Sequence, residues 1–153
     1  MATFAKKAVT NLRVFLEDTG FYRVPLTKLA TGHYKLEAKV NNVFGSFILD
    51  TGASTSCIGF ESAEKFELES ETSDIKAAGA GAINMSTKIS KTNTFFIKKW
   101  QKHAIDFVLF DLSHVNQALA QVDEMPVDGI LGADLLKKHK AVIDYGRNCL
   151  YIK

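Results

Sequence analysis

An apolar run that ends in an acid constrains this chain more than any other feature of its sequence. Residues 47–49, Phe-Ile-Leu, read as the end of a strand with both faces buried, and they lead directly into Asp50. A carboxylate at the end of a buried strand is costly unless it is hydrogen-bonded. Thr51 offers a hydroxyl, and Gly52 lets the backbone turn tightly enough to bring its N–H group to the carboxylate. An acid placed in this way indicates function.

The triplet Asp-Thr-Gly occurs twice, at 18–20 and at 50–52. By average amino-acid usage the triplet arises by chance in roughly 3% of chains of this length, so its surroundings must decide what each copy does. The first copy lacks the fully apolar lead-in and the small hydroxyl residues that follow the second. Because Asp and Gly favour turns, the copy at 18–20 is interpreted as a turn.

Alternating side chains predict a hairpin that delivers the chain to Asp50. Residues 34–40 alternate apolar and charged side chains, which is the period of a strand with one face in water. Asn41 and Asn42 supply turn chemistry, and residues 43–49 form the second strand.

The rest of the chain reads as short strands with a few short helices. Further strands are expected at 105–110, 141–145 and 149–152. Residues 72–97 predict another hairpin, with a glycine- and alanine-rich middle at 77–82 and a return strand that includes 95–97. Short helices are expected after Ile58, from Ser113 as a cap, and over 133–139, while residues 14–16 favour a short strand or a docking segment. This pattern predicts a mainly β domain over residues 21–153, built as a closed or nearly closed barrel with two or three short helices, and an N-terminal extension over residues 1–20.

Composition and charge exclude several classes of function. The 153 residues suit one domain, and a net charge of +2 with no long basic run argues against nucleic acid as a partner. Two cysteines without a C-x-x-C pair are expected to be small buried hydrophobes in a reducing compartment. The four histidines are scattered, so neither a metal site nor a cofactor is expected. No apolar run is long enough for a signal peptide or a membrane span, and a cytoplasmic location is expected, with a leader removed before position 1 as the open alternative.

The wider pattern around Asp50 resembles that of aspartic proteases. Residues 48–54 match the apolar-apolar-Asp-Thr-Gly-Ala-Ser motif, residues 79–81 occupy the place of that family's glycine-rich hairpin, and residues 130–132 match its apolar-apolar-Gly motif before a helix. Residues 128–152 also resemble the retropepsin-like families of cellular proteins. The resemblance covers about residues 21–153 and implies the closed β-barrel of the acid proteases.

The resemblance implies a site made by two subunits. The chain is too short to carry two motifs of this kind, so a homodimer is expected to bring together two copies of Asp50, with a peptide or protein as substrate. By the same resemblance, Thr51 hydrogen-bonds across the two-fold axis. The terminal strand Cys149–Lys153 is the first candidate for the interface, and the N-terminal extension, which could replace it there, is the alternative. The site residues implied are Asp50, Thr51 and Gly52 for catalysis, and Ala53, Ser54, Gly79, Ala80, Gly81 and Ile130 for substrate binding.

At two positions this sequence departs from the pattern of the aspartic proteases, and other functions are left open as alternatives. Ala53 stands where pepsin-like enzymes have a hydroxyl residue, which predicts a pH optimum nearer neutral, and Ser54 stands where retroviral enzymes have an acid that binds the substrate backbone. A catalytically weak or inactive peptide-binding or dimerisation module is the main alternative, and an unrelated small β-barrel binding protein is the other. The hairpin glycines also suit an ordinary loop, and Asp128 and Asp134 are interpreted as caps.

Overall fold

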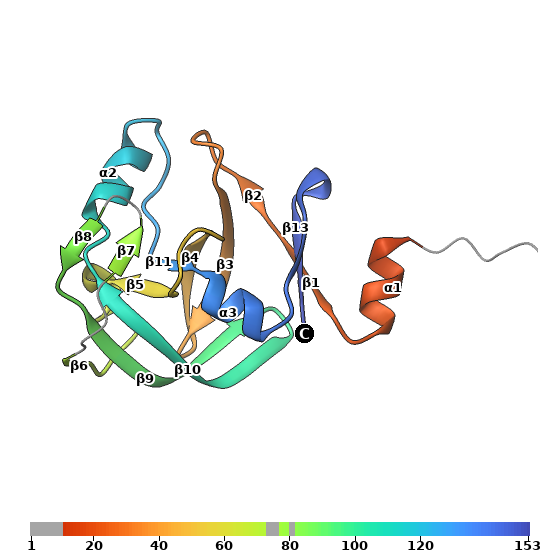
Figure 1. The fold of residues 1–153 in the computed structure, drawn as a ribbon, viewed down its shortest axis with the longest axis horizontal. Coiled ribbons are helices and arrows are strands. Elements are labelled where there is room, and N and C mark those ends of the chain that lie inside the picture. Colours follow the sequence, from red (N-terminus) through yellow and green to blue (C-terminus); the bar gives the residue numbers. More distant parts are fainter. Residues whose placement is uncertain (1–10, 73–76, 80–81) are drawn as a thin grey trace, which may run out of the picture.

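A closed barrel forms the centre of the molecule (Figure 1). The computed structural model describes residues 11–72, 77–79 and 82–153. The strands follow one another around a sheet that closes on itself, because the last barrel strand pairs with the first as well as with its neighbour in the sheet. This closed arrangement confirms the predicted fold class. In spatial order the strands are β3 (Tyr34–Val40), β4 (Val43–Leu49), β11 (Gly129–Leu131), β5 (Cys57–Gly59), β10 (Trp100–Phe110) and β9 (Lys88–Ile97), which pairs again with β3.

The hairpin of β3 and β4 is formed as predicted. Its register joins Val40 to Val43, so that Asn41 and Asn42 make the two-residue turn. Both asparagines have positive φ values, 49° and 69°, which is the backbone geometry that matches the twist of a tight hairpin. The side chains of β3 alternate between buried and more exposed, in agreement with the sequence pattern.

Aromatic rings fill the barrel and anchor the strand that leads to Asp50. Phe47 is fully buried, and its ring centroid lies 5.5 Å from that of Phe95 and 6.5 Å from those of Phe66 and Phe107. Burying a side chain of this size stabilises a fold by about 2–3 kcal/mol. Phe47 precedes Asp50 by three residues, so the core fixes the end of β4 in position.

The chain termini form a separate three-stranded sheet. Its central strand is β13 (Cys149–Ile152), flanked by β1 (Tyr22–Pro25) and β12 (Val142–Asp144). Leu150 and Ile152 pack into the barrel core, while Cys149 and Tyr151 pack against Leu16 on the other side. Both edges of β13 are therefore occupied within the chain, which does not fit the expectation that this strand pairs with a partner subunit.

A short helix, α1 (Leu12–Asp18), replaces the strand expected at 14–16. Asn11 starts the helix, because its side chain accepts a hydrogen bond from Val14 N at 2.9 Å. Leu16 alone among the helix residues is buried, since it covers the outer face of the terminal sheet. The docking role expected for this segment is thus correct and the strand is wrong. The triplet at 18–20 ends this helix in a turn, as predicted.

Two other helices lie close to their predicted positions. The helix α3 (Ala133–Lys138) matches the expectation, and α2 (Ser113–Ala120) begins at Ser113, although Leu112 and not Ser113 takes the capping position. The Asp111 side chain instead accepts a hydrogen bond from Ser113 N at 2.8 Å. No helix in the described part of the chain is both long and apolar enough to cross a membrane.

The remaining elements are short. After Ile58 the chain forms the 3-10 turn η1 (Phe60–Ser62) in place of the expected helix, although Phe66 is buried as that helix would have required. The terminal hairpin turns through η2 (Tyr145–Arg147), and β2 (Thr27–Lys28) and β6 (Glu71–Thr72) extend the barrel sheet at its ends.

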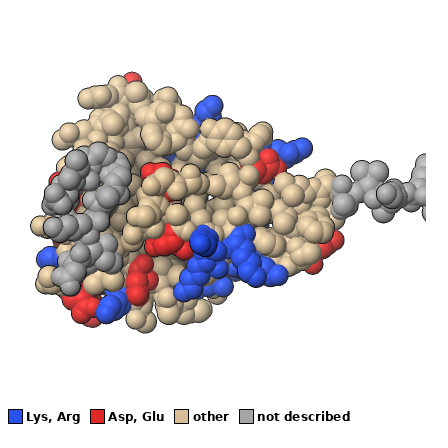
Figure 2. Space-filling model, in the orientation of Figure 1, with Lys and Arg blue, Asp and Glu red and all other residues tan. Residues whose placement is uncertain are grey.

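On the face seen in Figure 2, basic side chains gather over α3 and β10, and most of the remaining surface is uncharged.

Candidate active site

Asp50 follows β4 at the point where two parallel strands end side by side. Leu49 of β4 lies opposite Leu131 of β11, and Asp50 N donates a hydrogen bond to Leu131 O at 2.9 Å. The side chain of Asp50 is half-buried. The backbone of Asp50 therefore belongs to the barrel, while its carboxylate lies at the barrel's surface.

A tight turn wraps the chain around the Asp50 carboxylate. Gly52 N donates to Asp50 Oδ1 at 2.8 Å, and Ala53 N donates to the Asp50 carbonyl oxygen at 3.2 Å. A Cβ at position 52 would lie 3.2 Å from Oδ1, which is tighter than an ordinary contact. The hydrogen bond expected from Gly52 is therefore present, and the missing side chain leaves room for it. Thr51 and Gly52 are exposed beside the carboxylate.

A buried serine and an aspartate fix this turn to the start of α3. Ser56 is 1% exposed, and both its N and its Oγ donate to Asp134 Oδ1, at 2.9 and 2.7 Å. Ser56 Oγ in turn accepts a hydrogen bond from Gly132 N at 2.9 Å. Because residues 56 and 134 are 78 positions apart, no local pattern in the sequence could have revealed the pair. Asp134 also accepts a hydrogen bond from Leu135 N at 2.8 Å in the first turn of α3, so it acts at the helix start as predicted, and the bonds from Ser56 give it a second role.

The glycine of the second motif is required by a backbone contact. A Cβ on Gly132 would lie 2.6 Å from the carbonyl oxygen of Ala53, and Ala133 N donates to that same oxygen at 2.7 Å. Close approach of two backbones is one of the few reasons why a position accepts glycine alone. The two motifs, at 50–53 and 130–132, are thus joined directly.

A pocket of about 240 Å³ brings predicted site residues together. Asp50 and Ile130 both line it, with Ile48 of β4 and residues of α2 completing the wall. Ala53 packs against the apolar cluster that contains Ile48 and Ile130, and Ser54 is exposed. The lining of this pocket contains one carboxylate, that of Asp50.

The predicted glycine-rich hairpin is present in part of its length. The strands β7 (Ala77–Gly79) and β8 (Ala82–Met85) pair antiparallel, with Gly79 opposite Ala82. Ala80 and Gly81 lie outside the described residues. The strand that follows, β9, pairs with β10 and belongs to the barrel.

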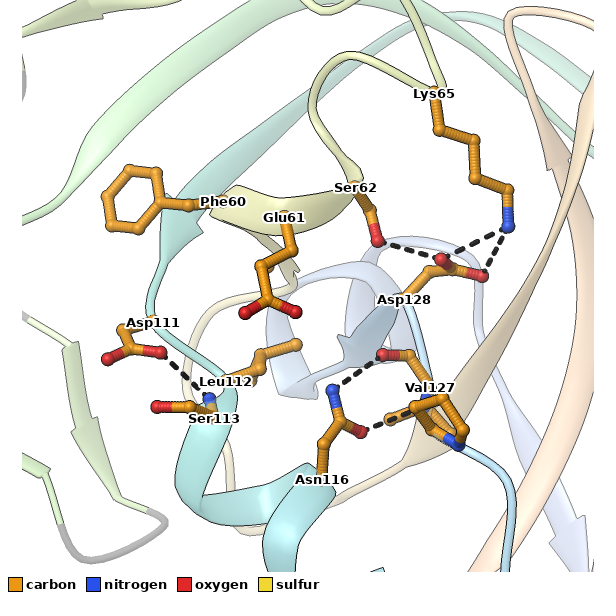
Figure 3. A pocket seen from close by; sticks show the side chains of 12 residues that line it. Phe60, Glu61, Ser62, Lys65, Asp111, Leu112, Ser113, Asn116, Val127 and Asp128 are labelled. Carbon is orange, nitrogen blue, oxygen red and sulfur yellow. Dashed lines mark hydrogen bonds and ion pairs between the residues drawn. The ribbon is translucent and has the colours of Figure 1, made fainter.

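A second pocket, of about 270 Å³, lies away from Asp50 and is shown in Figure 3. Asp128 is at its edge and accepts hydrogen bonds from Ser62 Oγ at 2.7 Å and Lys65 Nζ at 3.0 Å. It also accepts one from Ser46 N at 2.9 Å. Asp128 therefore ties β4 to the turn after β5, which corrects its interpretation as a cap.

A buried thiol lies next to the site. Cys57 is 3% exposed, and burial raises the pKa of its thiol to about 12, with the nearby charges of Asp134 and Asp50 acting in the same direction. Such a thiol stays protonated and is a poor nucleophile. Among the described residues, no group of three or more His, Cys, Asp and Glu is placed to bind a metal ion.

The barrel, with a single Asp-Thr-Gly turn joined to an apolar-apolar-Gly strand, is the architecture of a retropepsin-like aspartic protease. The family model described as aspartyl protease matches residues 36–135, and the chain belongs to this family. No curated protein matches the sequence.

Solved structures share the fold at low sequence identity. A retropepsin-like aspartic protease from Rickettsia conorii superposes with a TM-score of 0.59 and 23% identity, covering 87% of this chain and 89% of that one. The retroviral protease-like domain of Ddi1 from Leishmania major superposes with a TM-score of 0.52 and 19% identity, covering 78% of this chain and 86% of that one. The EIAV protease complexed with the inhibitor HBY-793 superposes with a TM-score of 0.50 and 20% identity, covering 75% of this chain and 86% of that one.

Proposed function

We propose that this protein is an aspartic endopeptidase that works as a homodimer, with Asp50 of each subunit supplying one of two catalytic carboxylates. The observation that carries the proposal is the lone carboxylate in the pocket, bonded to Gly52 N at 2.8 Å. Asp18, in the other triplet, ends a helix and does not line this pocket. A mechanism that needs two carboxylates therefore needs two chains.

The chemistry follows from placing two such carboxylates close together. Two acids at short distance do not both ionise readily, so the pair shares one proton. The ionised member acts as general base on a water molecule, and the protonated member polarises the peptide carbonyl. Gly52 N–H steadies one carboxylate oxygen in each subunit, and Thr51 is proposed to bond across the two-fold axis.

The exposure of the residues beside Asp50 supports a partner subunit at this surface. Thr51 and Gly52 are exposed beside Asp50, and an isologous interface brings identical residues together at its axis. Since both edges of β13 are occupied, a partner that leaves the terminal sheet intact must dock elsewhere than on that strand.

The substrate is proposed to bind as an extended peptide. The β7–β8 hairpin would close over it and exclude water, while the peptide backbone provides most of the recognition. Because Ala53 offers no hydroxyl to the Asp50 carboxylate, we expect an activity optimum nearer neutral pH than that of pepsin-like enzymes. A maximum at strongly acid pH would contradict this expectation.

The test compares the two triplets in the full chain. Wild type, Asp50→Asn and the matched control Asp18→Asn are incubated with a peptide library from pH 4 to 8, and the mass of each species is measured by sedimentation. We expect cleavage by the wild-type dimer, a loss of about 100- to 10,000-fold in Asp50→Asn, and no change in Asp18→Asn. Cleavage that survives in Asp50→Asn, or that comes from a monomer, would sink the proposal. A dimer that binds peptides and cleaves none would instead favour a peptide-binding module.

A further inference from the structure

The pocket beside Asp50 has apolar walls and two histidines. Ile48, Leu119 and Ile130 are each at most 3% exposed and belong to one apolar cluster, against which α2 packs. His33 and His114 line the same pocket. A pocket of about 240 Å³ is smaller than those that bind drug-sized ligands, and its size suits one side chain. The inference drawn from it rests on the proposed peptidase function.

The two imidazoles come from separate parts of the chain. His33 lies in the connection before β3, and its Nδ1 is 2.8 Å from Thr31 Oγ1, which orients the ring and leaves Nε2 available. His114 lies in the first turn of α2. Its Nε2 is shielded from solvent and has no hydrogen-bond partner in the described part of the chain.

The two imidazoles that line this pocket favour a particular chemistry in the ligand. A ring nitrogen of histidine donates or accepts a hydrogen bond, and a primary carboxamide offers both a donor and an acceptor, so a carboxamide can pair with a ring nitrogen in either role. A thioether or an alkyl side chain would fill the same space and leave His114 Nε2 unpaired. Leaving a buried polar group unpaired costs enough to select between ligands of equal size.

We infer that this pocket selects a glutamine side chain of the peptide substrate, with His33 and His114 as specificity-determining residues. The flexible apolar stem of glutamine lies against Ile48, Leu119 and Ile130, and its carboxamide bonds to the imidazoles. Because the pocket also contains Asp50, the selected residue lies next to the peptide bond that is cleaved.

The test uses peptides that differ at one position only. Starting from a peptide that the wild-type dimer cleaves, Gln, Met, Leu and Glu are placed in turn at each of the two positions on either side of the cleaved bond, and kcat/KM is measured at pH 7.5. Met is the comparison of nearly equal size. We expect Gln to be preferred over Met by roughly tenfold at one of these positions.

Three variants assign the preference to the pocket. His114→Phe keeps a ring of similar size without nitrogen, and we expect the ratio of kcat/KM for the Gln peptide to kcat/KM for the Met peptide to fall to twofold or less. His33→Phe should weaken the preference less, because His33 is exposed. His103→Phe is the matched control, since His103 is exposed on β10, contacts Phe96 and does not line the pocket.

The failure of this inference is distinct from the failure of the proposed function. Equal cleavage of Gln and Met peptides, or a Gln preference unchanged in His114→Phe, would overturn the inference and leave the peptidase standing. If no peptide is cleaved, the Gln and Met versions of one library peptide are compared by calorimetry for binding to the wild-type chain and to His114→Phe. A Gln preference that depends on His114 would then support the inference without catalysis, and a lack of any such preference, including a lack of binding, would overturn it.

Discussion

The two Asp-Thr-Gly triplets have the same composition and opposite structural roles. At 18–20, Thr19 Oγ1 donates to the carbonyl oxygens of Phe15 and Leu16, both at 3.0 Å, and Gly20 has a φ of +96°, so the triplet ends α1. At 50–52, Gly52 N donates to the Asp50 carboxylate at the end of a barrel strand. The first triplet uses its hydroxyl and its glycine to finish a helix, and the second uses its glycine to bind an acid.

Neighbours in space, more than the triplet itself, account for this difference. The turn after Asp50 is bonded to β11 and α3 through Leu131, Ser56 and Gly132. The turn after Asp18 contacts mainly its own helix and the flexible side chain of Lys153. Changes around residue 50 should therefore affect activity, and changes around residue 18 should affect local stability only.

The largest expected effect on stability comes from Gly132→Ala. The added Cβ would meet the Ala53 carbonyl oxygen at 2.6 Å, and backbone cannot give way as a side chain can. We expect a loss of about 3 kcal/mol in the free energy of unfolding, measured by urea denaturation. Gly146→Ala is the control, because nothing lies within 4 Å of its Cβ, and it should change stability by less than about 0.5 kcal/mol.

The next largest effect on stability is expected from removing the hydroxyl group of Ser56, compared with that of Thr19. Ser56→Ala removes a buried hydroxyl that bonds to Asp134 and accepts from Gly132 N, and it should cost about 1–3 kcal/mol and lower activity. Thr19→Ala removes exposed bonds at a helix end, and it should cost less than about 1 kcal/mol with activity unchanged. Equal losses in the two variants would contradict the comparison.

Alanine substitution at Gly52 and at Gly20 should have opposite effects, one on kcat and the other on stability. Gly52→Ala places a Cβ 3.2 Å from Asp50 Oδ1 without a positive φ, so we expect kcat to fall about tenfold with little change in stability. Gly20→Ala strains a left-handed backbone, so we expect stability to fall by about 1 kcal/mol with kcat unchanged. Steady-state kinetics and urea midpoints on the same preparations measure both quantities.

The smallest expected effect is a loss of stability in acid at His139. His139 is 7% exposed, and its ring centroid lies 4.9 Å from that of Trp100. Burial lowers the pKa of His139, the positive charges of Lys102 and Lys138 act in the same direction, and a hydrogen bond to the backbone of Lys153 opposes them. Asp106 and Asp134 line the pocket that His139 also lines.

The direction of this effect follows from comparing the folded and unfolded states. Below the ordinary histidine pKa of about 6.5, the unfolded chain takes up the proton more readily than the folded chain, so stability is complete above this pH and decreases below it. The urea midpoint should therefore fall between pH 7.5 and 5.5, and His139→Phe should reduce that dependence. Lys153 N donates to the His139 carbonyl oxygen, and a Cβ on Gly20 would lie 3.4 Å from the Lys153 side chain. Acid should therefore lower amide protection factors, which are corrected for the pH dependence of intrinsic exchange, more around residue 20 than around residue 52.

Sequence periodicity predicted the elements whose neighbours along the chain are enough to define them. The hairpin of β3 and β4 depends on alternation and on two asparagines that accept positive φ, and both features are local. The helix α3 and the terminal hairpin were predicted for the same reason. The segment at 14–16 was predicted less well, because its helical form depends on an asparagine cap and on the sheet that Leu16 covers.

By itself the sequence determined that one buried strand ends in an acid, that glycine must follow, and that the surrounding motifs are those of an aspartic protease. Only the tertiary structure decided that Ser56 bonds to Asp134, that β13 has no free edge, and that two histidines share a pocket with Asp50. The physical reason is distance along the chain. Local preferences set turns and strands, whereas contacts between residues tens of positions apart form only when the whole barrel closes.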